Sequence, residues 1–173
     1  MPPFGPVFIG LGTNLPYRGL AGTALLEAAL SAIGDTGVKV VKRSSFWASP
    51  ALPTGGAPQP DFVNAVAEAD PAGRGPEALW AVLVGVEQAF GRERRERWAA
   101  RTLDLDILDF AGMVSDGGEG RLTLPHPGIQ ARAFVLAPLA EIAPGWAHPV
   151  LHLGARTLLD RLPEGAIQRV GPG

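Results

Sequence analysis

The segment Gly91–Phe110, GRERRERWAARTLDLDILDF, carries charges of opposite sign in its two halves. The first half is a cluster of arginines around a tryptophan: Arg92, Arg94, Arg95, Arg97 and Arg101, with Trp98 among them. The second half, Leu103–Leu108, alternates apolar and acidic residues, which predicts a half-buried strand. Asp104 and Asp106 then share one face, about 7 Å apart along the backbone. Aspartate is depleted in strands, so a pair on one face requires a reason.

Two interpretations of this charge pattern are open. Paired carboxylates beside several guanidinium groups favour a divalent-metal site that handles phosphate, because arginine binds polyphosphate oxygens in a bidentate manner. The same residues are also compatible with a solvated edge face whose aspartates pair with nearby arginines, since many charge runs have no other role.

The bulk composition indicates one folded domain spanning residues 1–173, with 46% hydrophobic residues. We expect no secretion signal and no membrane span, because no apolar run is long enough. The chain has no cysteine, which excludes disulfides and thiolate ligands and agrees with a cytoplasmic protein. A net charge of −2 predicts no general attraction to nucleic acid or to membranes.

Apolar periodicity predicts a strand at 7–11, a helix at 20–33, strands at 37–47 and 62–68, a helix at 76–90 and a strand at 103–110. This order is the βαββαβ pattern of a ferredoxin-like α+β fold, with a mainly antiparallel sheet and helices on its faces. Further along the chain we expect a short strand at 121–124 and a short helix plus a strand within 129–143. The tail after Pro144 has no predicted role.

Two long loops interrupt this pattern, at 48–60 and at 91–100. The first reads ASPALPTGGAPQP, and its prolines and glycines exclude regular structure. A loop of this length and apolar character is typical of an active-site lid, although a tolerated surface insertion is the alternative.

Three further features have both a functional and an ordinary interpretation. Gly10 and Gly12 permit a ligand to approach the backbone closely, although two glycines alone are a weak signal. Phe62 and Asn64 share a strand face, where they can stack on and hydrogen-bond a polar ring, or form an ordinary edge surface. His126, between two prolines, is either an exposed loop residue or a phosphate contact.

Blocks that run nearly end to end then point to one family. They are IGLGTNL, SSFWASPAL, QPDFVNAV, GRERRERWAARTLDLDILDF and LTLPHPGIQARAFVLAPLAEIAP. In these blocks, which span roughly residues 7 to 144, the chain resembles the 6-hydroxymethyl-7,8-dihydropterin pyrophosphokinase family. The Arg-Thr-Leu-Asp-Leu-Asp-Ile run followed by the Pro-His block is the most specific part of the resemblance.

The resemblance implies transfer of a diphosphate group from ATP, the co-substrate, to the hydroxymethyl group of the pterin, with release of AMP, in folate biosynthesis. It implies two Mg²⁺ ions held by Asp104 and Asp106, with Arg92 and Arg101 completing the catalytic set. The implied ATP-binding positions are Glu87, Arg92, Arg101, Ile107, Arg121, Thr123, His126 and Arg132. The implied pterin-binding positions are Ser49, Pro50, Leu52, Phe62, Asn64, Trp98 and Phe134.

The chain departs from the family pattern at a few positions. Ser49 stands where threonine is common, Phe62 where tyrosine is common, and Ala99-Ala100 where Gly-Pro is usual. The arginine loop is also about one residue shorter than in the best-known bacterial members. None of these changes removes a metal ligand or a phosphate-binding arginine, so they bear on loop geometry rather than on activity.

Two other functions are compatible with the same residues. A two-metal phosphohydrolase would use the aspartate pair without a pterin. A non-catalytic nucleotide-binding or RNA-binding domain of the same fold is the other alternative, but it lacks the positive charge and the paired strand aromatics of RNA binders. We expect a monomer that acts on ATP and hydroxymethyl-dihydropterin and has no nucleic-acid or membrane partner.

Overall fold

The computed structural model describes residues 5–51, 57–91, 102–165 and 167–170. Its helices are α1 (Gly22–Asp35), α2 (Pro76–Ala89), α3 (Ala133–Ile142) and α4 (Ala155–Asp160), with short 3₁₀ turns at Gly118–Gly120 and Ile129–Ala131. Its strands are β1 (Val7–Thr13), β2 (Lys39–Arg43), β3 (Trp47–Ser49), β4 (Phe62–Asp70), β5 (Asp104–Phe110), β6 (Ser115–Asp116), β7 (Thr123–Leu124) and β8 (Gln168–Arg169).

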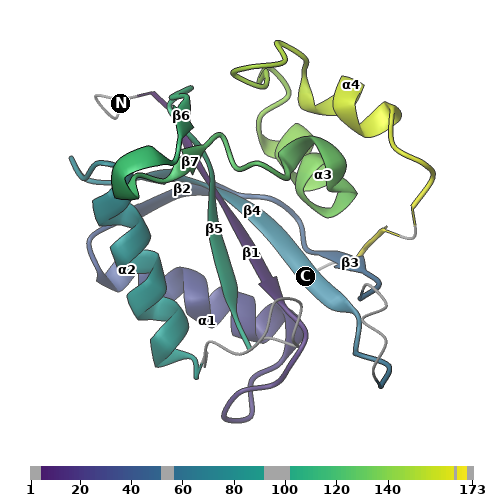
Figure 1. Cartoon of the computed structure of the whole chain (residues 1–173). Helices are drawn as coiled ribbons and strands as arrows, with labels where there is room; N and C mark the ends of the chain where they lie inside the picture. Colours follow the sequence, from purple (N-terminus) through teal and green to yellow (C-terminus); the bar gives the residue numbers. More distant parts are fainter. Residues whose placement is uncertain (1–4, 52–56, 92–101, 166, 171–173) are drawn as a thin grey trace.

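Six of these strands form one antiparallel sheet in the order β5–β1–β4–β3–β8, with β2 also paired to β4 (Figure 1). Helices α1 and α2 lie on one face of the sheet, and α3 and α4 pack on the other. The element order β1–α1–β2/β3–β4–α2–β5 confirms the predicted ferredoxin-like α+β fold. No helix in the described residues is long and apolar enough to cross a membrane.

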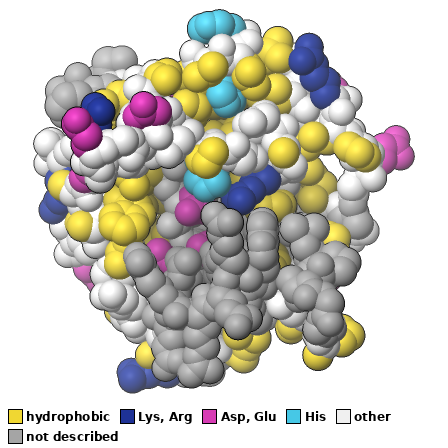
Figure 2. Space-filling model, in the orientation of Figure 1, with side chains coloured by type: hydrophobic (Ala, Val, Ile, Leu, Met, Phe, Trp, Pro, Cys, Tyr) yellow, Lys and Arg dark blue, Asp and Glu magenta, His cyan; other side chains and the backbone are white. Residues whose placement is uncertain are grey.

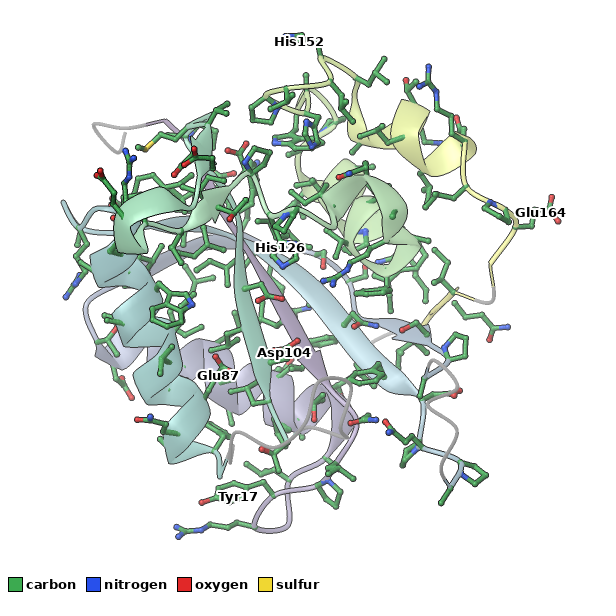
Figure 3. All side chains as sticks on the ribbon, viewed as in Figure 1. Tyr17, Glu87, Asp104, His126, His152 and Glu164 are labelled. Carbon is green, nitrogen blue, oxygen red and sulfur yellow. The ribbon has the colours of Figure 1, made fainter. Side chains whose placement is uncertain are left out.

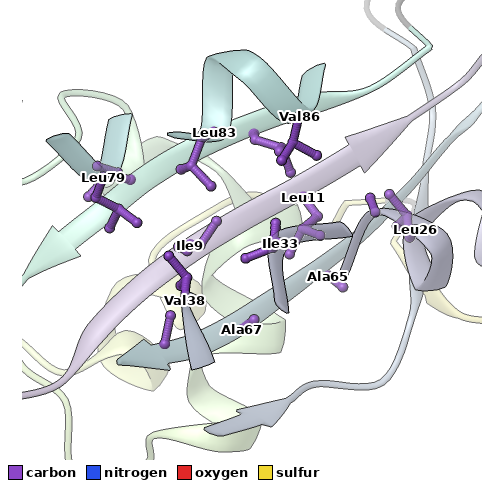
Figure 4. Packing of buried hydrophobic residues seen from close by; sticks show 14 of the residues in the cluster. Ile9, Leu11, Leu26, Ile33, Val38, Ala65, Ala67, Leu79, Leu83 and Val86 are labelled. Carbon is purple, nitrogen blue, oxygen red and sulfur yellow. The ribbon is translucent and has the colours of Figure 1, made fainter. Parts of the chain in front are cut away.

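Alternation along the central strands divides the apolar residues between two clusters. Ile9 and Leu11 of β1 face α1 and α2, where they meet buried side chains such as Leu26 and Leu83 (Figure 4). Phe8, the neighbour that precedes Ile9 in the strand, faces α3 and α4 instead. Burying a side chain of this size contributes about 1.5–3 kcal/mol, so these helices are stabilised mainly by the sheet beneath them.

A β-bulge interrupts the alternation near the end of β5. Phe8 pairs with Asp109 and Ile9 pairs with Ile107, so Leu108 is the extra residue. Leu108 and Asp109 therefore both turn toward the α3 side, where Leu108 joins the second apolar cluster. Strict alternation would instead have placed Asp109 in the core beneath α1 and α2.

The bulge gives the chain after Pro144 an anchor on β5. Trp146 donates a hydrogen bond from Nε1 to Asp109 Oδ2 at 2.7 Å, and Gly112 donates from its backbone N–H to Oδ1 at 2.9 Å. Asp109 is only 3% exposed, and this burial raises the pKa of its carboxyl even though both hydrogen bonds oppose the shift.

Three sequence-based expectations change in the structure. The strand expected at 37–47 is two strands, β2 and β3, because the regular pairing with β4 is interrupted at Ser44. Ser44 N still donates to Val66 O, but Val66 N donates to the Ser44 hydroxyl, which in turn donates to Ser45 O. The strand expected within 129–143 was wrong, since a 3₁₀ turn and α3 occupy that segment. The tail, which had no predicted role, adds α4 and β8.

Replacing Trp146 by phenylalanine removes the indole donor from a buried carboxylate, which should lower the free energy of unfolding by about 1–3 kcal/mol at neutral pH. Because the hydrogen bond from Trp146 lowers the pKa of Asp109, its loss should raise this already raised pKa further. Its cost is therefore present above that pKa and disappears as the pH falls through it. Urea unfolding of wild type and W146F from neutral to acidic pH measures the difference.

The Asp109→Asn background provides the control, because it has no titratable group at this position. W146F should have the same effect at every pH in that background. A pH-independent effect in the wild-type background would contradict the role of the Asp109 charge.

Candidate active site

The two aspartates of β5 lie on the sheet face opposite α1 and α2, as their spacing predicted. Leu105 and Ile107, which alternate with them, are buried in the core beneath those helices. Asp104 and Asp106 are partly exposed. In Figure 3, Asp104 lies on β5 below His126, while Glu87 projects from α2.

On β1, the strand that pairs with β5, the residues opposite the two aspartates are glycines and have no side chain. Gly10 of β1 pairs with Asp106, and Gly12 pairs with Asp104. On its other edge, Gly12 pairs with Asn64 of β4. Asp104, Gly12 and Asn64 therefore form one row across three strands, about 10 Å from end to end at a strand spacing of about 4.8 Å.

The middle of this row is a bare stretch of backbone. A Cβ placed on Gly12 would lie 3.3 Å from Asn64 Oδ1 and 3.9 Å from Phe62 Cδ1. A flat ligand can thus approach the backbone between the carboxylates and the amide. The register therefore explains the glycine pair noted in the sequence: it puts Gly10 and Gly12 beside the two aspartates.

The amide of Asn64 has a defined orientation. Its Nδ2 donates to Ser49 Oγ at 2.9 Å and to the backbone O of Trp47 at 3.2 Å. Ser49 also pairs with Phe62 across β3 and β4, so three of the predicted pterin positions are adjacent. Phe134 is half-buried on α3, which packs over the same face of the sheet, and Pro50 is exposed at the end of β3.

His126 is fixed against β5 by its backbone, which donates from N to Leu108 O at 2.8 Å. Burial, reinforced by the nearby charge of Arg132, lowers the pKa of His126 to about 4, so the ring is neutral at neutral pH. Its Nδ1 accepts from the N–H of Gly128 at 3.1 Å, so the proton resides on Nε2. Nε2 lies 3.7 Å from Asp106 Oδ2, which is too long for a hydrogen bond and leaves the N–H able to donate to a ligand oxygen.

Arg132 brings a positive charge to the same region at the start of α3. Its guanidinium carbon lies 5.8 Å from the centre of the Phe134 ring. A Cβ on Gly128 would come within 2.8 Å of Arg132 Nε, so the absence of a side chain there makes room for the guanidinium. On the face shown in Figure 2, a histidine, a basic residue and acidic residues gather over the middle of the sheet.

The remaining predicted positions are less closely grouped. Arg121 and Thr123 are exposed in or beside the β6–β7 hairpin, and Arg121 Nε donates to Gly118 O at 3.2 Å. Glu87 is buried in the last turn of α2. The side chain of Ile107 lies in the core on the far face of the sheet, so a nucleotide could reach only its main chain.

Four predicted positions lie outside the described residues: Arg92 and Arg101, assigned to catalysis and ATP, and Leu52 and Trp98, assigned to the pterin. Two side chains near the end of β1 bind the chain just after the undescribed ranges 52–56 and 92–101. Thr13 Oγ1 donates to Thr102 O at 2.6 Å, and Asn14 Nδ2 donates to Pro60 O at 3.2 Å. Sequence reasoning missed both, although the Gly-Thr-Asn run at the end of the first strand was visible.

The donor set suits Mg²⁺ in the presence of a polyphosphate. Mg²⁺ is usually bound by one or two carboxylates together with waters and substrate phosphates, and Asp104 and Asp106 supply two partly exposed carboxylates. Within the part of the chain that the structure describes, no cluster of three or more His, Cys, Asp and Glu side chains forms a complete metal site.

Comparisons with known proteins identify the family of the chain. The family model for 7,8-dihydro-6-hydroxymethylpterin-pyrophosphokinase matches residues 8–144. A 2-amino-4-hydroxy-6-hydroxymethyldihydropteridine pyrophosphokinase of Synechocystis is 39% identical over 166 residues, covering 95% of this chain and 80% of that protein. The enzyme of the same name from Methylorubrum extorquens is 38% identical over 168 residues, covering 94% and 97%.

Solved structures support the fold. The wild-type HPPK-DHPS protein of Plasmodium falciparum superposes with a TM-score of 0.66 at 12% identity, over 90% of this chain and 44% of that one. At this identity the likeness concerns the fold alone. The family-model match and the two bacterial relatives show that the chain belongs to the 7,8-dihydro-6-hydroxymethylpterin-pyrophosphokinase family.

Proposed function

We propose that this protein transfers a diphosphate group from ATP to the hydroxymethyl oxygen of 6-hydroxymethyl-7,8-dihydropterin, a step of folate biosynthesis. The observation that carries the proposal is the row of Asp104, Gly12 and Asn64 across three adjacent strands. This row supports the proposal because Asp104, which suits a metal–phosphate, and Asn64, which suits a heterocycle, lie at its two ends. Between them is the bare backbone of Gly12, which we call the floor of the site.

The pterin lies over Gly12 with its polar edge toward Asn64. Asn64 uses its Nδ2 on Ser49 and Trp47, so its Oδ1 faces the floor as an acceptor for a ring N–H or amino group. Phe62 and Phe134 supply aromatic faces for the ring. Pro50, Leu52 and Trp98 complete the pocket in this proposal.

Asp104 and Asp106 hold two Mg²⁺ ions together with the ATP phosphates. When bound, these ions would supply Lewis-acid activation of the hydroxyl and neutralise phosphate charge. Asp104 lies at the opposite end of the row from Asn64, and Asp106 follows it on the same face of β5, so the metal-bound polyphosphate would lie near the hydroxymethyl end of the pterin.

The triphosphate lies along the β5 side of the site. The neutral ring of His126 donates a hydrogen bond from Nε2 to a phosphate oxygen. The guanidinium of Arg132 offsets the negative charge of the phosphates, and neither group needs to gain or lose a proton. Arg92 and Arg101 stabilise the charge that develops in the transition state. Glu87, Arg121, Thr123 and the main chain of Ile107 bind the rest of the nucleotide.

In the reaction a bond forms between the hydroxymethyl oxygen and the β-phosphorus, and the bond from that phosphorus to the bridging α–β oxygen breaks. AMP leaves with the bonding electron pair, and the hydroxyl proton is released. The residues named here act mainly by positioning, which contributes up to about 7–11 kcal/mol in favourable cases. We further propose that residues 1–173 form a single domain that acts as a cytoplasmic monomer.

The product test separates this reaction from hydrolysis. Incubation with ATP, Mg²⁺ and hydroxymethyl-dihydropterin should yield AMP and pterin diphosphate in equal amounts, with no AMP when the pterin is omitted. Chromatographic separation of the nucleotides and pterins measures this. Accumulation of ADP, or release of phosphate without pterin, would show that the proposed transfer is wrong.

Asp104→Ala and Asp106→Ala should each lower turnover by at least 10²–10³-fold, roughly the loss seen when one charge-stabilising group is removed from an active site. Thermal stability should stay the same or rise, because one of two neighbouring like charges is removed. Asp160→Ala, an exposed aspartate paired with Arg156 on α4, is the matched control and should retain full activity. Turnover by D106A near the wild-type rate would exclude the metal role.

Gly12→Ala should weaken pterin binding, because the new methyl group stands on the floor between Asn64 and Phe62. Affinity for an ATP analogue measured without pterin should be unchanged. Gly34→Ala is the control: this helical glycine has open space around its Cβ position, so alanine there should raise stability by about 0.5–1 kcal/mol and leave binding intact. Calorimetric titration of both variants distinguishes a blocked floor from a general effect.

A further inference from the structure

Glu141, in the last turn of α3, contacts a segment of the chain far from it in sequence. Its Oε1 accepts hydrogen bonds from Ser45 N at 2.8 Å and from Ser45 Oγ at 2.7 Å. Its Oε2 accepts from Trp47 Nε1 at 3.2 Å and lies 3.4 Å from a guanidinium nitrogen of Arg169. One carboxylate thus joins α3, the start of β3 and the C-terminal strand β8.

These contacts make the carboxylate a fixed acceptor. Its partial burial opposes ionisation, but the hydrogen bonds from Ser45 and Trp47 and the charge of Arg169 outweigh it and lower the pKa of Glu141. At neutral pH both oxygens therefore accept, which is the state that three donors and a guanidinium require.

The C-terminal strand holds β3 from its other edge. Arg169 pairs with Trp47 in the β3–β8 ladder, and Val170 N donates to Phe46 O at 2.9 Å. The guanidinium carbon of Arg169 lies 5.6 Å from the centre of the Trp47 indole. Trp47 is therefore held at its ring edge by Glu141 and at its ring face by Arg169.

The position of Trp47 controls the amide of Asn64. β3 has three residues, and Trp47 O and Ser49 Oγ, which orient the Asn64 amide, both belong to it. If β3 shifts, these two acceptors move away from Nδ2, and Oδ1 no longer faces the floor over Gly12. A strand this short has few ladder hydrogen bonds of its own to prevent such a shift.

We propose that Glu141 and Arg169 are positioning residues for the pterin: they hold β3 so that Ser49 and Trp47 orient Asn64 toward the ring. The inference rests on the proposed pterin placement. It also gives a role to β8, which lies beyond residues 8–144, the part matched by the family model.

The test measures two affinities in each variant: that of hydroxymethyl-dihydropterin with a non-hydrolysable ATP analogue present, and that of the analogue alone. Glu141→Ala should weaken pterin binding by about fivefold, the factor equivalent to ~1 kcal/mol for a lost hydrogen-bonding partner. Affinity for the analogue should not change. Arg169→Met should have a smaller effect in the same direction, and Glu141→Gln should recover part of the loss because its amide oxygen still accepts from Ser45.

Asp160→Ala is the matched control, since it breaks another ion pair of the C-terminal region, between Arg156 and Asp160 at 3.3 Å, away from β3. It should leave both affinities unchanged. If Glu141→Ala weakens the nucleotide analogue as much as the pterin, its role is general stability and the positioning inference is wrong.

The Asn64→Ala background separates this inference from the proposed function. Because Glu141 acts through Asn64, Glu141→Ala should have little further effect on pterin affinity in that background. An undiminished fivefold effect there would overturn the positioning role while leaving the pterin site intact. Unchanged pterin affinity in Asn64→Ala alone would overturn the pterin placement itself, and the inference with it.

Discussion

The constraint on which this site depends is the register of β1 between β5 and β4. One face of β1 must fill the core beneath α1 and α2, and Ile9 and Leu11 do so. The other face must stay bare between Asp104 and Asn64, and Gly12 meets that requirement. Because strand side chains alternate with a period of two, core packing and site geometry are met by consecutive residues of one strand.

The phosphate contacts that we propose for this face require no proton change in the protein. The neutral ring of His126 donates from a nitrogen fixed by the contact with Gly128, while Arg132 supplies the permanent positive charge. The aspartates are partly exposed, so they can bind an ion that keeps some of its water. The acidic groups of β5 therefore lie near a neutral histidine and a permanent positive charge that come from the segment between β7 and α3.

The C-terminal region contacts both sides of the site-bearing face. Trp146 is bonded to Asp109 of β5, at one end of the strand order, and Arg169 pairs with Trp47 of β3, near the other. The ferredoxin-like order could be predicted from periodicity, since each helix and strand has its own local pattern. The tail could not, because its short elements are stabilised by contacts rather than by an apolar repeat.

The sequence by itself determined which residues share a face in the regular part of a strand: Asp104 with Asp106, and Phe62 with Asn64, since neighbours there alternate. It did not reveal the bulge at Leu108, where the alternation fails. Which strands lie side by side, and in which register, was decided only by the tertiary structure. Pairing depends on side chains distant in sequence, as in the contact of Glu141 with Ser45, 96 residues away. A local pattern contains no information about such a partner, so the row across three strands and the orientation of its amide emerge only when the sheet forms.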